Sequence, residues 1–146
     1  MSGQATPDLA RLLRDKLAEG RFQNFLQLEL VDHDATVGAV TLRAPWRPEF
    51  ERGPGTLQWH GGTMAALIDI AGDFALIAKL GRGSPPIDLR IDYLRPAVDT
   101  DLIARARTLR AGRTVGVVDI ELSDKQGRVV AVGRGGYSTL RKDNAV

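Results

Sequence analysis

The sequence contains no cysteine and only two histidines, and these shortages exclude several kinds of site. Without cysteine the chain has no disulfide, no thiolate nucleophile and none of the usual structural zinc ligand sets. The two histidines, His33 and His60, lie far apart in the sequence, and no His-Glu-x-x-His pattern is present. We therefore expect no bound metal.

Two common signatures of enzymes are also missing. The four serines, Ser2, Ser84, Ser123 and Ser138, all lie outside any Gly-x-Ser-x-Gly elbow. The glycine pairs at 53–55 and 81–83 lack the remaining glycine and the strand–helix context of a dinucleotide fingerprint. The sequence thus argues against the usual serine hydrolase design and against a nucleotide cofactor.

Long apolar runs and a strong net charge are absent as well. No apolar segment of about 18 residues occurs, and residues 1–19 lack the apolar core of a signal peptide. The formal net charge is +2 and aromatic residues make up only 5% of the chain, so no stacking surface accompanies its arginines. We expect a cytoplasmic protein that binds neither a membrane nor nucleic acid.

The length of 146 residues and the hydrophobic content of 43% fit one domain with a real core. Thr6-Pro7-Asp8 has the composition of a helix start, apolar residues follow at helical spacing, and Gly20 ends the pattern. We therefore divide the chain into an N-terminal helix within residues 1–22 and a main domain at 23–142.

The main domain alternates strand patterns with short turns. Strands are predicted at about 28–32 and 36–43, with His33-Asp34 as the turn between them, and a loop lying over the site is predicted from Pro45 to Gly55. Four more strands are predicted at about 87–93, 102–109, 113–123 and 128–140. The turns between the last three are too short for a crossover helix, so these strands should be antiparallel.

Between the two groups of strands lies a segment, 61–80, that is apolar on nearly every side. Such a helix is normally buried, yet this one contains Asp69 and Asp73. The expected fold is α+β, with one antiparallel sheet wrapped around this central helix and an outer or edge surface free to pair with a second copy.

The start of this helix has the properties of a site. The His60-Gly61-Gly62 turn leaves backbone N–H groups open at the positive end of the helix dipole, where they suit a developing negative charge. Asp69 is either catalytic or a satisfied acid at a helix interface, because an unpaired carboxylate in an apolar helix needs a reason. His60 either orients the substrate or caps the helix, and Asp73 reads as a polar interface residue.

Several motifs together resemble the hotdog-fold acyl-CoA thioesterases, in particular the branch of the phenylacetate-pathway thioesterases. They are the His60-Gly61-Gly62 turn, Asp69 nine positions later, the 93–97 stretch Tyr-Leu-Arg-Pro-Ala, the 112–114 turn Gly-Arg-Thr and the closing 133–137 stretch Gly-Arg-Gly-Gly-Tyr. The resemblance covers roughly residues 28–140 and implies a hotdog fold that hydrolyses an acyl-CoA to a free acid and CoA.

The resemblance also implies a division of labour between two chains. The amide of Gly61 or Gly62 of one chain would bind the oxyanion, and Asp69 of the other would act as general base or as nucleophile. It implies a homodimer, possible pairing of dimers into a homotetramer, and no cofactor, since CoA is part of the substrate.

Further residues are assigned to substrate binding. Arg95, Arg113 and Arg134 are expected at strand ends near the anionic part of CoA, because arginine suits phosphate. Pro54 and Pro86 stand at two positions where relatives often carry a polar side chain. Gln58 has the nearest side-chain amide to position 54 and is assigned to substrate binding in its place. These departures motivate an alternative, a non-hydrolytic acyl-CoA-binding or sensing protein. A hydratase of the same fold is disfavoured, because the helix carries Asp69 without a following histidine.

Overall fold

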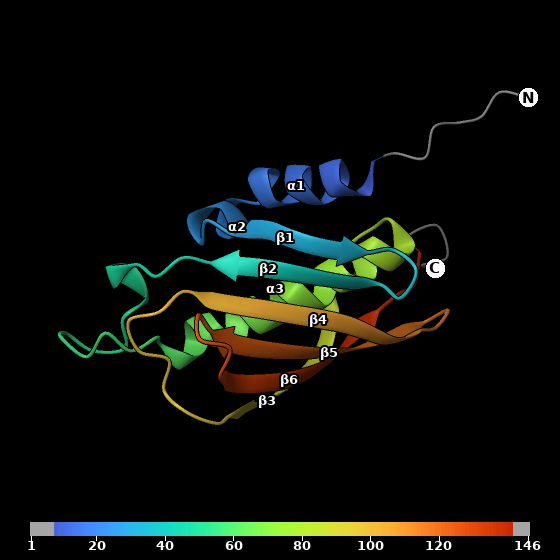
Figure 1. Cartoon of the computed structure of the whole chain (residues 1–146). Helices are drawn as coiled ribbons and strands as arrows, with labels where there is room; N and C mark the ends of the chain where they lie inside the picture. Colours follow the sequence, from blue (N-terminus) through green and yellow to red (C-terminus); the bar gives the residue numbers. More distant parts are fainter. Residues whose placement is uncertain (1–7, 142–146) are drawn as a thin grey trace, which may run out of the picture.

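The computed structural model describes residues 8–141, in which helices and strands follow the predicted order with two additions (Figure 1). The helical elements are α1 (Leu9–Glu19), α2 (Arg21–Phe25), the 3-10 helix η1 (Pro48–Phe50) and α3 (Gly61–Leu80). The strands are β1 (Glu29–Asp34), β2 (Ala39–Ala44), β3 (Pro86–Tyr93), β4 (Leu102–Ala111), β5 (Val115–Asp124) and β6 (Val129–Ser138).

The six strands form one antiparallel sheet in the order β1-β2-β4-β5-β6-β3, and α3 lies along one face of it (Figure 1). The segment that contains α3 thus separates β2 from β3, which pairs with β6 at the opposite edge from β1. This arrangement confirms the predicted hotdog fold, with a central helix held by a single sheet.

The core lies between α3 and the inner face of the sheet. Ile68, Ala71 and Ala75 of α3 are fully buried, as are Val118 and Leu122 of β5. Because the sheet covers one side of α3 and α1 also packs against the helix, apolar residues are needed nearly all round it. Gly81, in the left-handed conformation with φ of 76°, ends α3.

The predicted N-terminal helix is confirmed as α1. It begins at Leu9, where the side chain of Asp8 accepts a hydrogen bond from the Ala10 N–H at 3.1 Å, and it ends before Gly20. The predicted Thr6 and Pro7 lie outside the described residues. The short helix α2 was not predicted, and the proposed boundary between residues 22 and 23 falls inside it; the division into two parts stays a prediction.

The turn predicted at His33-Asp34 is wrong, because both residues belong to β1, opposite Val40 and Ala39. The turn follows at residues 35–38. The Asp34 side chain accepts from the N–H of Thr36 at 2.8 Å, and the turn closes at Gly38, whose φ is 72°. An aspartate that binds the backbone two residues on is a turn signal for the residues after it.

Strand β3 forms an exposed edge of the sheet. The alternation of apolar and polar residues over 87–93 predicts one face on the core, and Leu89 and Ile91 do pack against it, although they are only partly buried and Ile87 is 60% exposed. The edge position accounts for this partial exposure, since β3 has a single neighbouring strand. Pairing of this edge with a second copy stays a prediction.

Candidate active site

The start of α3 is capped by His60. Its Nδ1 accepts a hydrogen bond from the Gly62 N–H at 2.9 Å, so in the neutral ring the proton lies on Nε2. The structure therefore shows the capping role of His60, while a contact with substrate stays a prediction. The cap also occupies the amide of Gly62.

Gly61 offers the open amide of the turn. No acceptor among residues 8–141 takes its N–H, whereas its carbonyl accepts a hydrogen bond from the hydroxyl of Tyr93 at 2.7 Å. The hydroxyl of Tyr93 thus fixes the turn from β3 without blocking the N–H. Of the two glycines predicted to bind an oxyanion, Gly61 is the one whose amide is available.

Asp69 lies in the middle of α3 and lines a pocket of about 250 Å³. The pocket wall is completed by Asp73 and Ile70 of the same helix, by the 83–86 segment before β3, and by Gln23 of α2. The hydroxyl of Tyr137 donates to the Asp69 carbonyl at 2.8 Å and lies 3.4 Å from Oδ1. The carboxylate is thereby placed at a small hollow with an aromatic hydroxyl behind it.

The surroundings of the two carboxylates hold their pKa values above the ordinary range. Burial is the main cause of the raised pKa of Asp69, and the Tyr137 hydroxyl opposes it. Burial likewise raises the pKa of Asp73, opposed by the Ser84 N–H that donates to its Oδ1 at 2.7 Å, while the Asp69 charge adds to the rise. Raised carboxyl pKa values in a pocket are typical of acid–base sites.

Asp69 and Gly61 of one chain do not meet. They are eight positions apart in the α-helix, which corresponds to about 12 Å along the axis. A thioester carbonyl attacked by a water molecule bound to Asp69 is therefore too far from the Gly61 N–H of the same chain to accept a hydrogen bond from it. If the two groups act together, they must come from different chains.

Gln58 and Ser84, the polar residues near Pro54 and Pro86 in the sequence, differ in their relation to the Asp69 pocket. Gln58 lies in the loop before α3, where its Oε1 accepts from Arg52 Nη1 at 3.1 Å, and it does not line the Asp69 pocket. Pro86 lines that pocket, and Ser84 does so as well. The Ser84 hydroxyl is buried and has no hydrogen-bond partner among the described residues.

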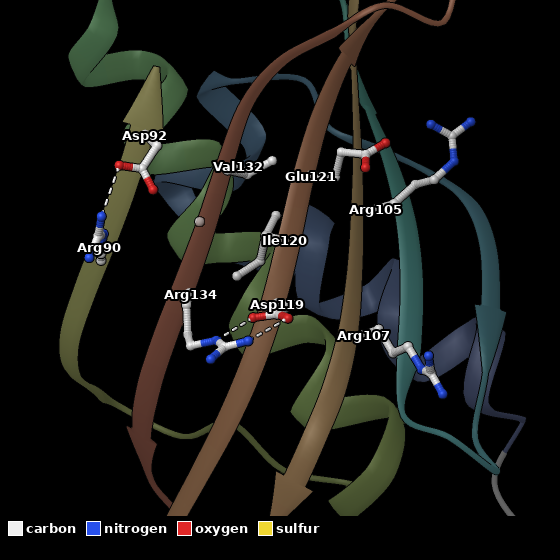
Figure 2. Close-up of a pocket in the computed structure, with 10 residues that line it drawn as sticks. Arg90, Asp92, Arg105, Arg107, Asp119, Ile120, Glu121, Val132 and Arg134 are labelled. Carbon is white, nitrogen blue, oxygen red and sulfur yellow. Dashed lines mark hydrogen bonds and ion pairs between the residues drawn. The ribbon is translucent and has the colours of Figure 1, made fainter. Parts of the chain in front are cut away.

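The three predicted CoA-binding arginines do not converge within one chain. Arg95 follows the end of β3 near the Gly61 turn, whereas Arg113 precedes β5 at the opposite end of the sheet, and both are exposed. The expectation that Arg134 lies at a strand end is wrong, because it sits within β6 on the outer face of the sheet. There its guanidinium pairs with Asp119 at 2.6 and 2.9 Å (Figure 2).

A hollow of about 630 Å³ lies on this same outer face. Registers across the sheet place four of its lining residues in one row, Arg107, Asp119, Arg134 and Arg90 (Figure 2). The sheet separates this row from α3, and two of its three arginines already have carboxylate partners, Arg134 with Asp119 and Arg90 with Asp92. We therefore assign the chemistry to the smaller Asp69 pocket.

The sequence analysis missed Tyr137, although two glycines, Gly72 and Gly135, mark the space that its ring occupies. A Cβ on Gly72 would lie 2.8 Å from Tyr137 Cζ, and a Cβ on Gly135 would lie 2.6 Å from Tyr137 Cε2. A glycine inside a helix and another inside a strand often mark a close approach. The contribution of Gln23 was not predicted, because it depends on how α2 lies relative to α3.

Comparison with known proteins agrees with this geometry. The family model described as the thioesterase superfamily matches residues 58–131, which include the His60 turn, α3, strands β3, β4 and β5, and the start of β6. The chain belongs to the thioesterase superfamily. Within the described residues of this thioesterase-family protein, no helix is long and apolar enough to cross a membrane, and no group of three or more potential metal ligands occurs.

Relatives of known name and structure share this family. A Halobacterium salinarum protein named "Putative esterase" is 36% identical over 98% of this chain and its own full length. The acyl-coenzyme A thioesterase PaaI of Escherichia coli is 36% identical over 52% of this chain and 54% of its own. A crystal structure from the thioesterase superfamily superposes with a TM-score of 0.84 at 28% identity, covering 89% of this chain and 97% of that one.

Proposed function

We propose that the protein is an acyl-CoA thioesterase that hydrolyses its substrate to a free acid and CoA at a site shared by two copies of the chain. The observation that supports this most is Asp69, a carboxylate of raised pKa that lines a pocket on the helix whose first amide is open. PaaI of Escherichia coli, a named acyl-CoA thioesterase, supports the substrate class.

Two routes are open to Asp69. As a general base it takes a proton from water while the oxygen attacks the thioester carbon; the tetrahedral intermediate then expels the CoA thiolate. As a nucleophile it forms an anhydride with loss of the thiolate, and water opens the anhydride. In both routes negative charge develops on the carbonyl oxygen, where the Gly61 N–H of the partner chain would donate.

The substrate would enter from the Gly61 end. Arg95 follows β3 only two residues after Tyr93, which binds the Gly61 carbonyl, so it is the best placed of the predicted arginines to meet an anionic group of CoA. Arg113 and Arg134 serve this role only if a second chain brings them to the same site. We propose a homodimer as the smallest active form, with a dimer of dimers as a larger assembly.

A thiol-release assay over a panel of acyl-CoAs tests the proposal. Wild-type protein should release CoA, and Asp69→Asn should lower kcat by about 10² or more, as expected when an essential acid–base group is lost. Asp15→Asn on the exposed face of α1 removes an equal charge from a side chain that does not line the pocket and should leave kcat unchanged. Equal turnover by wild type and Asp69→Asn would refute the assignment.

One observation favours a second candidate, a non-hydrolytic acyl-CoA-binding protein. Pro86 lines the Asp69 pocket with an apolar ring that cannot position water. In that case calorimetry would show tight binding of an acyl-CoA while the same sample releases no thiol. The two measurements on one preparation separate the candidates.

A further inference from the structure

The N-terminal segment contributes a side chain to the Asp69 pocket. Gln23 of α2 lines it together with Asp69 and Asp73, although some 45 residues of sequence separate α2 from these carboxylates. The pocket, at about 250 Å³, has room for a few water molecules and a reacting group. Any polar atom of Gln23 there is close to the place where we expect the chemistry.

The pocket is rich in hydrogen-bond acceptors and poor in donors. Ionised Asp69 and Asp73 only accept, whereas the Gln23 amide donates through two N–H groups. The one other donor side chain of the wall, Ser84, is 3% exposed. Gln23 is partly exposed, so it presents the more accessible donor.

The position of the Gln23 side chain depends on Gly20. An ideal Cβ on Gly20 would lie 2.6 Å from Gln23 Cδ, so the side chain folds back across this glycine. The φ of Gly20 is −68°, an angle that every residue adopts, and its backbone therefore does not require glycine. The missing side chain at position 20 makes room for Gln23.

A purely structural role of Gln23 would be a capping box. Gln23 is the third residue of α2, from which a side chain can reach back to the N–H of the capping residue. That N–H, of Gly20, instead donates to the Lys16 carbonyl at 3.1 Å. Within residues 8–141 no group hydrogen-bonds to the side-chain amide of Gln23, so the two N–H donors of that amide remain available.

We propose that Gln23 donates a hydrogen bond to the attacking water beside Asp69 of the same chain and is thus a catalytic residue of the site. This rests on the proposed function, with Asp69 as general base. A water that gives one proton to Asp69 and accepts from Gln23 keeps a lone pair free for the thioester carbon. The N-terminal helices then complete the catalytic pocket.

The test compares kcat, KM and pH profiles of thiol release for Gln23→Leu and Gln23→Glu. Gln23→Leu should lower kcat about tenfold, the value of one hydrogen bond, with KM nearly unchanged. Gln23→Glu should move the acid limb of the kcat/KM profile to higher pH, because a third carboxylate raises the pKa of Asp69. Asn24→Ala, on an exposed neighbour of the same helix, should leave both unchanged.

Gly20→Ala provides an independent route if a variant at position 23 misfolds. Its Cβ meets the far end of a flexible side chain, so the protein should fold while Gln23 swings away and kcat falls. Combined with Gln23→Leu, Gly20→Ala should cause no further loss. Wild-type kcat and pH profile in folded Gln23→Leu would overturn the proposal for Gln23; if Asp69→Asn is still inactive, the thioesterase assignment stands.

Discussion

The hydroxyl of Tyr137 on β6 donates to the backbone carbonyl of Asp69 at 2.8 Å and stands 3.4 Å from its carboxylate. The ring of Tyr137 is fully buried, so this hydroxyl is fixed from the sheet side of α3. It favours the ionised form of Asp69 against the burial that disfavours it. The sheet therefore helps to set the protonation of a residue on the helix.

Tyr137→Phe should move the acid limb of the kcat/KM profile to higher pH. The substitution keeps the ring and removes the hydroxyl that lowers the pKa of Asp69, so a higher pH is needed to ionise the carboxylate. Loss of the hydrogen bond should also cost about 1 kcal/mol in free energy of unfolding. A pH–rate series on both proteins checks this, and an unchanged acid limb would contradict it.

Asp69→Asn should raise the melting temperature at neutral pH while it lowers kcat. The folded protein has a raised pKa at Asp69, so ionisation opposes folding, fully above the raised pKa and not at all below the unfolded value of about 4. The gain should therefore shrink as pH falls toward 4. Scanning calorimetry at several pH values measures it, and a gain independent of pH would be evidence against a buried ionised acid.

Gly61→Ala should separate folding from activity. A Cβ at Gly61 would lie 3.6 Å from the Tyr93 ring, an ordinary contact, and alanine favours a helix over glycine by up to about 1 kcal/mol. Stability should stay equal or rise. The methyl group crowds a substrate that approaches the open N–H, so kcat/KM should fall at least tenfold; full activity in this variant would remove Gly61 from the site.

Mixed dimers of Asp69→Asn and Gly61→Ala chains test the shared site. One of the two sites in a mixed dimer would combine an intact Gly61 with an intact Asp69, and the other would carry both substitutions. Co-expression with two different tags should recover up to half of wild-type activity in the mixed dimer, although each variant alone is poorly active. A mixed dimer no better than its parents would show that each site belongs to one chain.

Gly135→Ala should destabilise the fold and disturb Asp69 through Tyr137. The new Cβ would lie 2.6 Å from Tyr137 Cε2, and a fully buried ring has no free space to move into. Such overpacking typically costs 1–3 kcal/mol. Gly53→Ala is the control, since its Cβ meets only a Thr56 methyl group at 3.7 Å, and chemical denaturation compares the two.

The sequence predicted the elements whose signals are local. Helix α3 was predicted over the correct residues because its signals follow one another directly in the sequence: the cap at His60, the apolar run and the terminating Gly81. The turn after β1 was predicted too early in the sequence, because the Asp34 side chain hydrogen-bonds the backbone of the residues that follow it. Helix α2 has only five residues, too few for a periodic pattern.

The candidate site was predictable in its α3 residues and not in their partners. Asp69 stood out as a charge in an apolar helix, but the Tyr137 hydroxyl and the Gln23 side chain reach it only through pairing of β5 with β6 and through the fold of α2. The same limit applies to Arg134. Its place on the outer face, with Asp119 as partner, follows from strand register rather than from its position in a turn motif.

The position of α3 in the chain, ahead of four of the six strands that cover it, has a consequence for biosynthesis. Roughly 60 residues separate the end of α3 from the end of β6, which corresponds to about 3–12 s of translation at 5–20 residues per second. During that time α3, one of the most apolar segments of the protein, has left or is leaving the ribosome before the strands that bury it have been synthesised. The nascent chain should therefore engage chaperones most strongly after α3 emerges and lose them once β6 is complete.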